Sequence, residues 1–212
     1  AIKIIYDWSE VKGSSANIAL FPTINKVYPL PKGLVLIVAP WNYPVQLVLA
    51  PLVAAISAGC ACVVKPSEDA PNCEKVIKKL IEEAFDSKYI SCITGIGAEV
   101  VPPIIDSGLI NHVFFTGSTA VGKTIAKQCA EHLITSTLEL GGKSPTIVDQ
   151  TANIKVAAKR IAWGKFYNAG QTCVAPDYVL VHQSQKATLI ENLIASIEEF
   201  YGKDQRASDT HG

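Results

Sequence analysis

Methionine is absent from this sequence, and charged residues make up only 18% of its 212 positions. Soluble domains usually carry about 25% charged residues, so the low fraction indicates extensive burial, in part against segments that the chain does not contain. The net charge is +0, so no excess of positive charge favours binding to nucleic acid or to an acidic membrane surface. Together with a first residue of Ala1, the lack of methionine favours a fragment of a longer protein.

The six cysteines include no Cys-x-x-Cys pair, and the Cys60-x-Cys62 spacing matches no zinc-binding pattern. We therefore expect no metal site. Cys60, Cys62 and Cys92 lie in apolar runs and are predicted to be small buried hydrophobic residues. No secretory signal is visible, which favours an intracellular protein, in the cytoplasm or on an organelle membrane surface, where thiols stay reduced.

No charged residue occurs over positions 33–64, a run long enough for a membrane-spanning helix. Three prolines interrupt the run, however, and a proline inside a helix removes a backbone hydrogen bond. A buried strand over 34–39, a buried helix over 45–58 and a second strand over 60–64 therefore explain it better than a spanning helix.

Short apolar segments of strand length alternate along the chain with longer segments of helical periodicity. The run at 34–39 is continuously apolar, as expected for a parallel strand covered on both faces. In the segment 72–85 the apolar side chains share one helical face, while lysines and glutamates point outward. The alternation predicts a doubly wound parallel α/β sheet. Further strands are predicted at 90–93, 112–115, 137–140, 145–148 and 178–182, and further helices at 120–131, 153–167 and 186–201.

The two ends of the chain differ from this regular pattern. Residues 1–30 are predicted to contain the end of a helix and then an extended arm, at 19–31. The segment 168–177 is the expected junction between two lobes. We therefore predict one α/β domain at residues 1–168, incomplete at its N-terminus, and the truncated beginning of a second at 169–212.

Two short motifs carry the strongest chemical signal. The first, Glu139-Leu140-Gly141-Gly142-Lys143, places a carboxylate at the end of an apolar strand, before a turn with paired glycines. The second, Gly170-Gln171-Thr172-Cys173, places a cysteine after a turn that follows a long helical segment. A carboxylate base and an exposed thiol on adjacent loops are the minimum for covalent catalysis through a thioester. Taken alone, Cys173 would more often be structural, so its assignment depends on the other motifs.

A third motif lies where a strand turns into a helix, over residues 115–124. Gly117 frees the turn, Gly122 lets helix and sheet pack closely, and backbone N–H groups at the helix start can face a phosphate. The same residues satisfy the pattern G-x-x-x-x-G-K-[ST] of P-loop nucleotide hydrolases. That alternative leaves Glu139 and Cys173 unexplained, and a tight turn without any ligand is the other alternative.

Two further strand ends carry polar residues. Lys65 and Glu68 follow the strand at 60–64, where both could hydrogen-bond ribose hydroxyls. The alternative is a helix N-terminal turn with a favourable acidic residue. Asn42 follows the strand at 34–39, where a side-chain amide can donate to a developing oxyanion. The alternative for Asn42 is an asparagine that only satisfies its own turn.

Five motifs in order resemble those of the aldehyde dehydrogenase superfamily, over nearly the whole chain: Pro-Trp-Asn, Lys-Pro-Ser-Glu, Phe-Thr-Gly-Ser, Glu-Leu-Gly-Gly-Lys and Gly-Gln-Thr-Cys. The sequence from Cys173 to Val179 is similar to the class 3, fatty-aldehyde branch, because other branches usually carry a glycine and a basic residue just after this cysteine. The resemblance implies a Rossmann-like NAD-binding domain at 1–168 and the start of a catalytic domain at 169–212.

The resemblance also implies catalytic roles. Cys173 would be the nucleophile, and Asn42 with the backbone N–H of Cys173 would form the oxyanion hole. Glu139 would be the general base that activates water, and Tyr43 would line the aldehyde tunnel. Lys65 and Glu68 would hold the adenine-side ribose. The other residues implied in cofactor binding lie in the third motif and are Gly117 and Ser118 beside the pyrophosphate, Val121 against the adenine, and Gly122.

The implied reaction oxidises an aldehyde, medium- or long-chain and aliphatic, to a carboxylic acid through a thiohemiacetal and a thioester. Because the Glu68 carboxylate would repel a 2′-phosphate, NAD is the expected cofactor, with NADP as the alternative. The expected partners are a small-molecule aldehyde and, in the full-length protein, a second copy in a homodimer. Any membrane anchor would lie beyond Gly212. A non-catalytic fragment that binds NAD without turnover is a further alternative.

Overall fold

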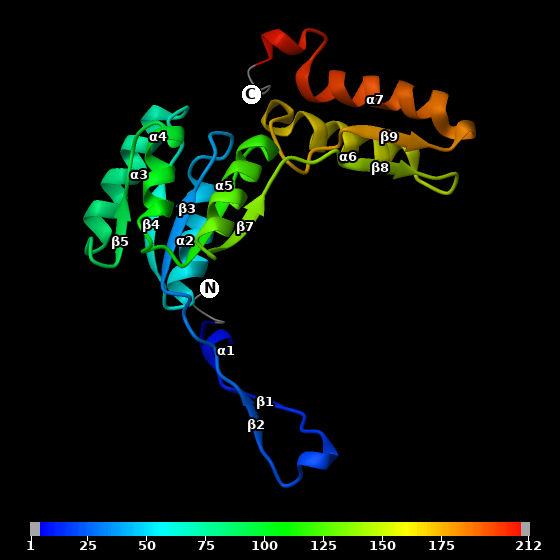
Figure 1. The fold of residues 1–212 in the computed structure, drawn as a ribbon. Coiled ribbons are helices and arrows are strands. Elements are labelled where there is room, and N and C mark those ends of the chain that lie inside the picture. The colour runs from blue at the N-terminus through cyan, green and yellow to red at the C-terminus, as the bar shows by residue number, and fades with distance from the viewer. Residues whose placement is uncertain (1–4, 209–212) are drawn as a thin grey trace. The chain divides into compact units, whose positions relative to one another are not determined.

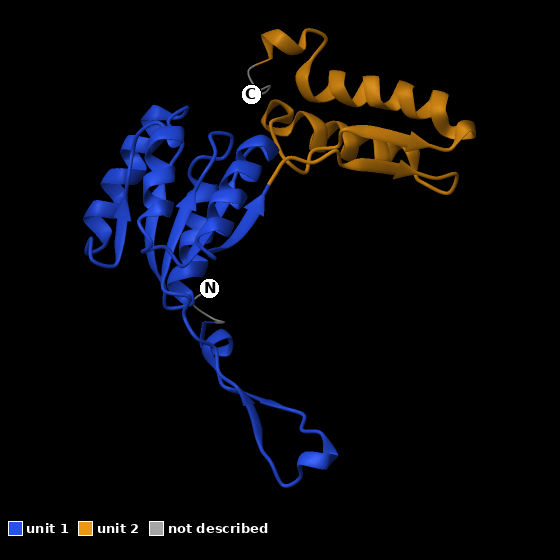
Figure 2. Ribbon diagram, viewed as in Figure 1, with its two compact units in different colours: residues 1–139 blue, residues 140–212 orange. Residues whose placement is uncertain are grey.

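The computed structural model describes residues 5–208, and the chain forms two compact units, residues 1–139 and residues 140–212 (Figure 2). The expected domain boundary between residues 168 and 169 falls inside the second unit, and as a boundary of the whole protein it stays a prediction.

The first unit is built on a five-stranded parallel sheet with the order β5-β4-β3-β6-β7 (Figure 1). The first of these strands in sequence, β3, lies in the middle, so the chain winds outward from it in one direction and then in the other. This confirms the predicted doubly wound parallel sheet. The strands are β3 (Leu34–Val38), β4 (Ala61–Lys65), β5 (Ile90–Cys92), β6 (His112–Thr116) and β7 (Thr135–Glu139).

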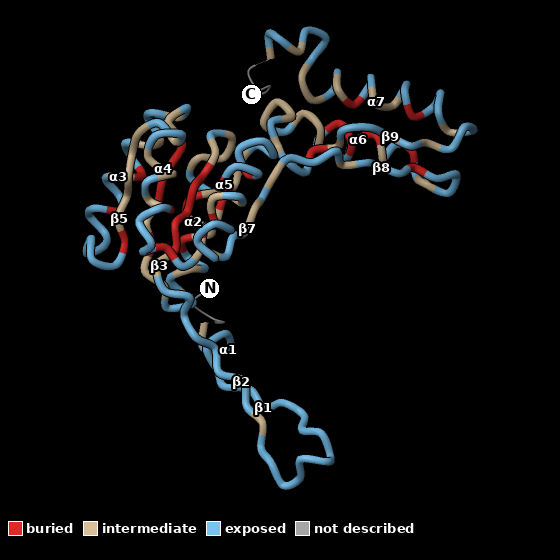
Figure 3. Tube along the Cα trace, viewed as in Figure 1, coloured by how far each residue is buried: buried red, intermediate tan, exposed pale blue. Residues whose placement is uncertain are grey.

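Helices connect successive strands of this sheet: α2 (Gln46–Ser57), α3 (Pro71–Ala84), α4 (Gly97–Asp106) and α5 (Thr119–Glu131). Apolar residues of α2 and α3 pack in one core against β3 and β4, and α4 packs against α5. The most deeply buried residues follow the strands and the inner faces of these helices (Figure 3). The first core contains Val35, Ile37, Ala39, Val48, Leu52, Cys62, Val64, Ile77, Ile81 and Ile90.

Three features of this unit differ from the predictions. Helix α4 was not predicted, because Pro102 and Pro103 lie inside it and proline is a poor helix residue. Helix α2 is buried only along one face, by Val48 and Leu52, rather than throughout. Of the three cysteines predicted to be buried, only Cys62 is, and Cys60 and Cys92 are half-buried.

An arm precedes the sheet. It contains α1 (Ile5–Ser9) and an antiparallel hairpin of β1 (Lys12–Ser14) and β2 (Asn25–Val27), with a 3₁₀ turn at Ile18–Leu20 between the strands. An extended arm was predicted at 19–31. The hairpin was not predicted, and only its second strand, β2, falls within that range. Among the described residues, no helix has the length and apolar character needed to cross a membrane. The charge-free run at 33–64 is instead strand, helix and strand, as predicted.

The second unit contains a parallel strand pair, β8 (Pro145–Val148) and β9 (Tyr178–Val181), with α6 (Ile154–Phe166) and α7 (Lys186–Tyr201) packed against each other. Short 3₁₀ segments lie at Gln183–Gln185 and Gln205–Ala207, and the segment Tyr167–Gly170 after α6 is a turn with non-helical backbone angles. The core of this unit joins one side of the strand pair to both helices. Its buried residues are Val148, Ile154, Ala158, Ile161 and Leu189.

Candidate active site

A cavity of about 560 Å³ lies in the first unit at the carboxyl ends of β3, β4 and β6. The strand order reverses here, between β3 and β6, and such switch points are where open α/β sheets bind ligands. The structure thus brings five of the six predicted cofactor residues to one cavity. They are Lys65, Glu68, Gly117, Ser118 and Val121.

Lys65 and Glu68 form a hydrogen-bonded pair on the cavity wall. The Lys65 side chain is only 1% exposed, and its Nζ donates to the Pro66 carbonyl at 2.7 Å and to the Glu68 carboxylate. The other carboxylate oxygen of Glu68 accepts from the Gly97 N–H at 2.6 Å. Partial burial acts to raise the pKa of Glu68, but the hydrogen bonds from Lys65 and Gly97 outweigh it and leave the pKa below its ordinary value. Glu68 is therefore an ionised acceptor beside a buried cation.

The turn between β6 and α5 forms another part of the wall. Ser118 caps α5, and its Oγ accepts from the Val121 N–H at 3.3 Å. A Cβ on Gly117 would stand 2.5 Å from the Phe115 ring, so any other residue would force this ring to move. The start of α5 thus lies at the cavity, where its N–H groups favour an anion. Gly122 is buried within α5 and is absent from the residues that line the cavity.

The P-loop alternative is not favoured by this geometry. Helix α5 begins at Thr119, so Gly122 and Lys123 of the matching pattern lie within the helix. Only Gly117 and Ser118 separate β6 from α5. A P-loop needs a longer glycine-rich loop whose backbone N–H groups surround the phosphates.

Several residues that line the cavity were missed by the sequence predictions. Four of them come from α4: Gly97, Ala98, Val101 and Pro102. Trp41 and Gln128 also line the cavity, and the Gln128 amide donates to the Pro102 carbonyl at 2.9 Å. The apolar periodicity of Val101 and Ile105 was the available signal for α4, but the paired prolines obscured it.

Two predicted catalytic residues, Asn42 and Glu139, lie at or just beyond the ends of strands of the five-stranded sheet. Asn42 lies after β3 and is half-buried, and its side-chain oxygen is inaccessible to solvent. The adjacent Tyr43, predicted to contact substrate, is half-buried, and its carbonyl accepts from the Leu47 N–H at the start of α2. Glu139 ends β7 beside Thr116 of β6, is exposed, and accepts through its carbonyl from the Gly117 N–H at 3.0 Å. Glu139 is thereby tied to the turn at the cavity.

The predicted nucleophile, Cys173, is an exposed free thiol in the second unit. The glycine pair that follows Glu139 belongs to the same unit, and a Cβ on Gly142 would stand 2.8 Å from the Cys173 carbonyl oxygen. Two more contacts join these loops: the Asp177 N–H donates to the Ser144 carbonyl at 3.0 Å, and the Asp177 carboxylate pairs with Lys143 at 3.2 Å. The loop after Glu139 is therefore bound to the loop that carries Cys173.

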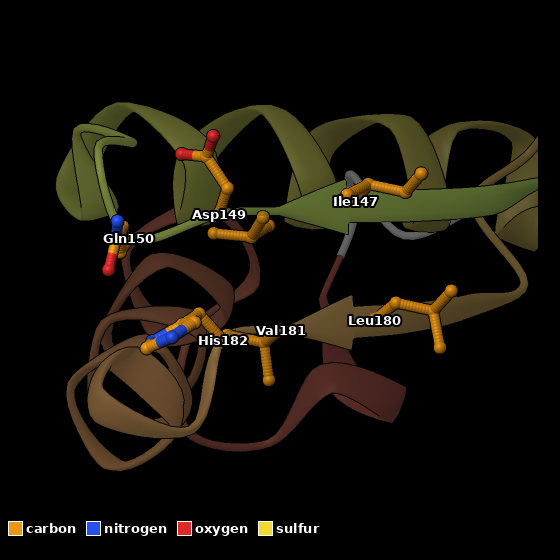
Figure 4. A pocket seen from close by; sticks show the side chains of 7 residues that line it. Ile147, Asp149, Gln150, Leu180, Val181 and His182 are labelled. Carbon is orange, nitrogen blue, oxygen red and sulfur yellow. The ribbon is translucent and has the colours of Figure 1, made fainter.

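A second hollow, of about 460 Å³, lies over the ends of β8 and β9 (Figure 4). Ile147 and Leu180 present their side chains there, and Asp149 and His182 follow the two strands. Hydrogen bonds from Thr151 lower the pKa of the Asp149 carboxyl. None of the residues predicted for aldehyde oxidation or NAD binding lines this hollow. Among residues 5–208, no group of His, Cys, Asp and Glu is arranged to hold a metal ion.

A doubly wound sheet, a cavity at its switch point and a capped helix N-terminus define a nucleotide-binding α/β protein. The sequence model of the aldehyde dehydrogenase family matches residues 8–212. The chain therefore belongs to the aldehyde dehydrogenase family.

Three curated relatives are similar over essentially the whole chain. The 4,4'-diaponeurosporen-aldehyde dehydrogenase of Staphylococcus aureus is 50% identical over 100% of this chain and 46% of its own length. Aldehyde dehydrogenase family 3 member B2 of Mus musculus is 41% identical over 100% of this chain and 44% of its own. The dimeric, NADP-preferring aldehyde dehydrogenase of Mus musculus is 40% identical over 100% of this chain and 46% of its own. The expected similarity to class 3 is thereby confirmed.

A solved structure supports the same assignment. The substrate-bound state of Staphylococcus aureus AldH superposes with a TM-score of 0.92 at 50% identity, over 99% of this chain and 45% of that one. The chain spans less than half the length of each of these relatives.

Proposed function

We propose that the protein containing this chain oxidises an aldehyde to a carboxylic acid with NAD or NADP. The main observation behind the proposal is the cavity in the first unit. Lys65 and Glu68, which can hydrogen-bond a ribose, line this cavity together with the turn at Gly117, which is suited to a phosphate. These residues fit a dinucleotide, since they supply a buried cation, an ionised acceptor and a helix N-terminus at one site.

The chemistry follows from the remaining residues. The Cys173 thiolate attacks the aldehyde carbon and forms a tetrahedral thiohemiacetal. The Asn42 amide and the backbone N–H of Cys173 stabilise the developing oxyanion. Lys65, Glu68 and the turn at Gly117 would hold the dinucleotide, and its oxidised nicotinamide would supply the acceptor for the hydride that must leave this carbon. Glu139 then takes a proton from water, which attacks the resulting thioester and releases the acid and the thiolate.

The cofactor proposed is NAD, with NADP as the alternative. Glu68 is held ionised by Lys65 and Gly97, and an ionised carboxylate beside the ribose repels a 2′-phosphate. An NADP-preferring relative supports keeping the alternative. In the first unit Val121 is half exposed, at the start of α5, and is assigned to the adenine.

The substrate proposed is a medium- or long-chain aliphatic aldehyde, which would place the protein in lipid metabolism, with Tyr43 beside the aldehyde. The similarity to members of aldehyde dehydrogenase family 3 supports this class, because the sequence after Cys173 resembles the fatty-aldehyde branch. We also propose an intracellular homodimer, supported by the relative described as dimeric.

The test compares the full-length protein with its Cys173→Ala and Cys73→Ala variants. Reduced nicotinamide is followed by absorbance, with hexanal or hexadecanal as substrate and NAD or NADP as cofactor. We expect signal in the wild type and in Cys73→Ala, whose changed cysteine lies on α3, and none in Cys173→Ala. A folded protein that binds NAD but oxidises neither aldehyde would instead support the non-catalytic alternative.

A further inference from the structure

Three successive residues just before the cysteine loop adopt left-handed backbone conformations. The φ angles are +51° at Asn168, +53° at Ala169 and +76° at Gly170. Glycine adopts this conformation freely and asparagine tolerates it, but alanine does not, because its Cβ crowds the following carbonyl. Among the described residues other than glycine, positive φ occurs elsewhere only at Leu133. The turn at 168–170 is therefore an unusual and strained segment.

Local contacts hold this turn in place. The Asn168 carbonyl accepts from the Gln171 N–H at 3.0 Å and from the Gln171 side-chain amide at 3.2 Å. A Cβ on Gly170 would stand 3.0 Å from the Lys165 carbonyl, so the last turn of α6 lies directly against the glycine. Residues 165–171 thus constrain one another, as strained segments require if they are to persist.

The far end of the cysteine loop is held as well. The Ala175 side chain is buried, and its N–H donates to the Thr172 carbonyl at 3.1 Å. Pro176 packs on α6 beside Gly164, where a Cβ would lie 3.4 Å from the proline ring. Between these anchors Cys173 is exposed, and the neighbouring Val174 is 73% exposed. The loop that carries the Cys173 thiol is therefore fixed at both of its ends.

We propose that the left-handed turn at 168–170 positions Cys173, and that Ala169 is its key positioning residue. The inference rests on the proposed role of Cys173 as the nucleophile. A glycine at 169 would adopt the same φ without strain, but it would also allow many other conformations. Alanine allows fewer backbone conformations than glycine. It therefore favours a single course of the chain from α6 to Cys173, at the cost of local strain.

The expected consequence is a precise placement of the sulfur. Displacement of a reacting group by about 1 Å can cost on the order of 100-fold in rate. Loosening the turn should therefore lower kcat without weakening cofactor binding, because the cofactor cavity lies in the first unit. A purely structural role predicts only a change in stability.

Two variants of the full-length protein separate these roles, Ala169→Gly and Ala169→Asn. We expect Ala169→Gly to lower kcat at least tenfold, with the KM for NAD unchanged and a melting temperature equal to or above that of the wild type. Ala169→Asn keeps a residue that tolerates positive φ but is less free than glycine, so its kcat should stay within about twofold of the wild type.

Leu133→Gly is the matched control. Leu133 has a φ of +56° at the end of α5 and is 92% exposed, so its replacement relieves the same kind of strain in the first unit. It should raise stability and leave kcat unchanged. Wild-type kcat in Ala169→Gly, or an equal loss in both variants at 169, would overturn the proposal.

A second readout does not depend on dehydrogenase activity. The rate at which iodoacetamide alkylates Cys173, followed by peptide mass, should change at least threefold in Ala169→Gly and not in Leu133→Gly. If the wild type oxidises no aldehyde, the proposed function fails, yet this rate still tests whether the turn positions the thiol. An unchanged rate in Ala169→Gly would then overturn the positioning role itself.

Discussion

Gly142 lies so close to the backbone of Cys173 that a Cβ at position 142 would stand 2.8 Å from the Cys173 carbonyl oxygen. Real Cβ atoms essentially never approach another atom to this distance. Both partners are backbone, so neither can move aside as a flexible side chain would. The motif that begins with Glu139 and the motif that ends with Cys173 are thus joined by a contact that only glycine permits.

Replacing Gly142 should therefore displace the nucleophile. We expect Gly142→Ala to lower kcat by about 10- to 100-fold, because the new methyl group pushes the Cys173 backbone out of place. Gly141→Ala is the control, since a Cβ at 141 meets no atom within 4 Å. Steady-state kinetics and thermal unfolding of both variants provide the measurement. Equal activity in the two variants would contradict the prediction.

Asn42 is predicted to donate to the oxyanion. Removal of one such donor usually costs about 100- to 1000-fold in kcat, so Asn42→Ala should show a loss of this size. The KM for NAD should not change, because Asn42 is not among the residues that line the cofactor cavity. Initial rates at saturating aldehyde test this, and a loss of less than about tenfold would argue against the oxyanion role.

Glu68 is predicted to set cofactor choice. Glu68→Gln keeps the shape of the side chain but removes the charge that repels a 2′-phosphate, so kcat/KM with NADP should rise relative to NAD, by about tenfold. Glu82→Gln, on the exposed face of α3, is the control and should leave the ratio unchanged. The ratio of kcat/KM values for the two cofactors is the measurement. An unchanged ratio would show that Glu68 does not determine the choice between NAD and NADP.

His112 is predicted to make stability depend on pH. Its ring nitrogens lie 2.7 Å from the Thr135 hydroxyl and 3.1 Å from the Thr137 hydroxyl. Burial, and secondly the charge of Lys32, lower the pKa of the ring below its ordinary value. As the pH falls, the unfolded chain therefore takes up a proton at His112 before the folded chain does. The contribution of His112 to the free energy of unfolding is thus complete above about pH 6.5 and is lost as the pH falls through the folded-state pKa.

The measurement for His112 is the melting temperature of the wild type and of His112→Gln across this range. The advantage of the wild type should shrink as the pH falls below about 6.5. An advantage that stays constant, or one that grows on acidification, would show that the ring is not held neutral by its surroundings.

The sequence predicted those parts of the fold that depend on local patterns. The continuous apolar runs located β3 and β4 to within a residue or so at most ends, since a parallel strand covered on both faces has no polar alternation. Helix α3 was predicted because its charges and its apolar residues separate cleanly onto two faces. The predicted strand at 137–140 begins two residues late, because β7 starts with Thr135 and Ser136, which carry no apolar signal.

Other features could not be predicted from local pattern. Helix α4 exists despite two internal prolines, because Val101 and Ile105 are buried and Gln128 of α5 binds the Pro102 carbonyl. The P-loop pattern matched the sequence but not the backbone, because α5 begins before the second glycine of the pattern. A sequence motif does not indicate where a loop ends and a helix begins. The packing of α5 on its neighbours determines that position.

Residue types and their order were enough to indicate the class of chemistry: a cysteine, a glutamate and an asparagine at strand or helix ends, with glycine turns suited to phosphate. The tertiary structure decided which residues meet. It paired Glu68 with Lys65 and with the Gly97 amide of an unpredicted helix, and it placed Gly142 against the Cys173 carbonyl. The contacts of Glu68 with Gly97 and of Gly142 with Cys173 join residues far apart in the chain, and they arise only when strands and helices pack, which no local propensity encodes.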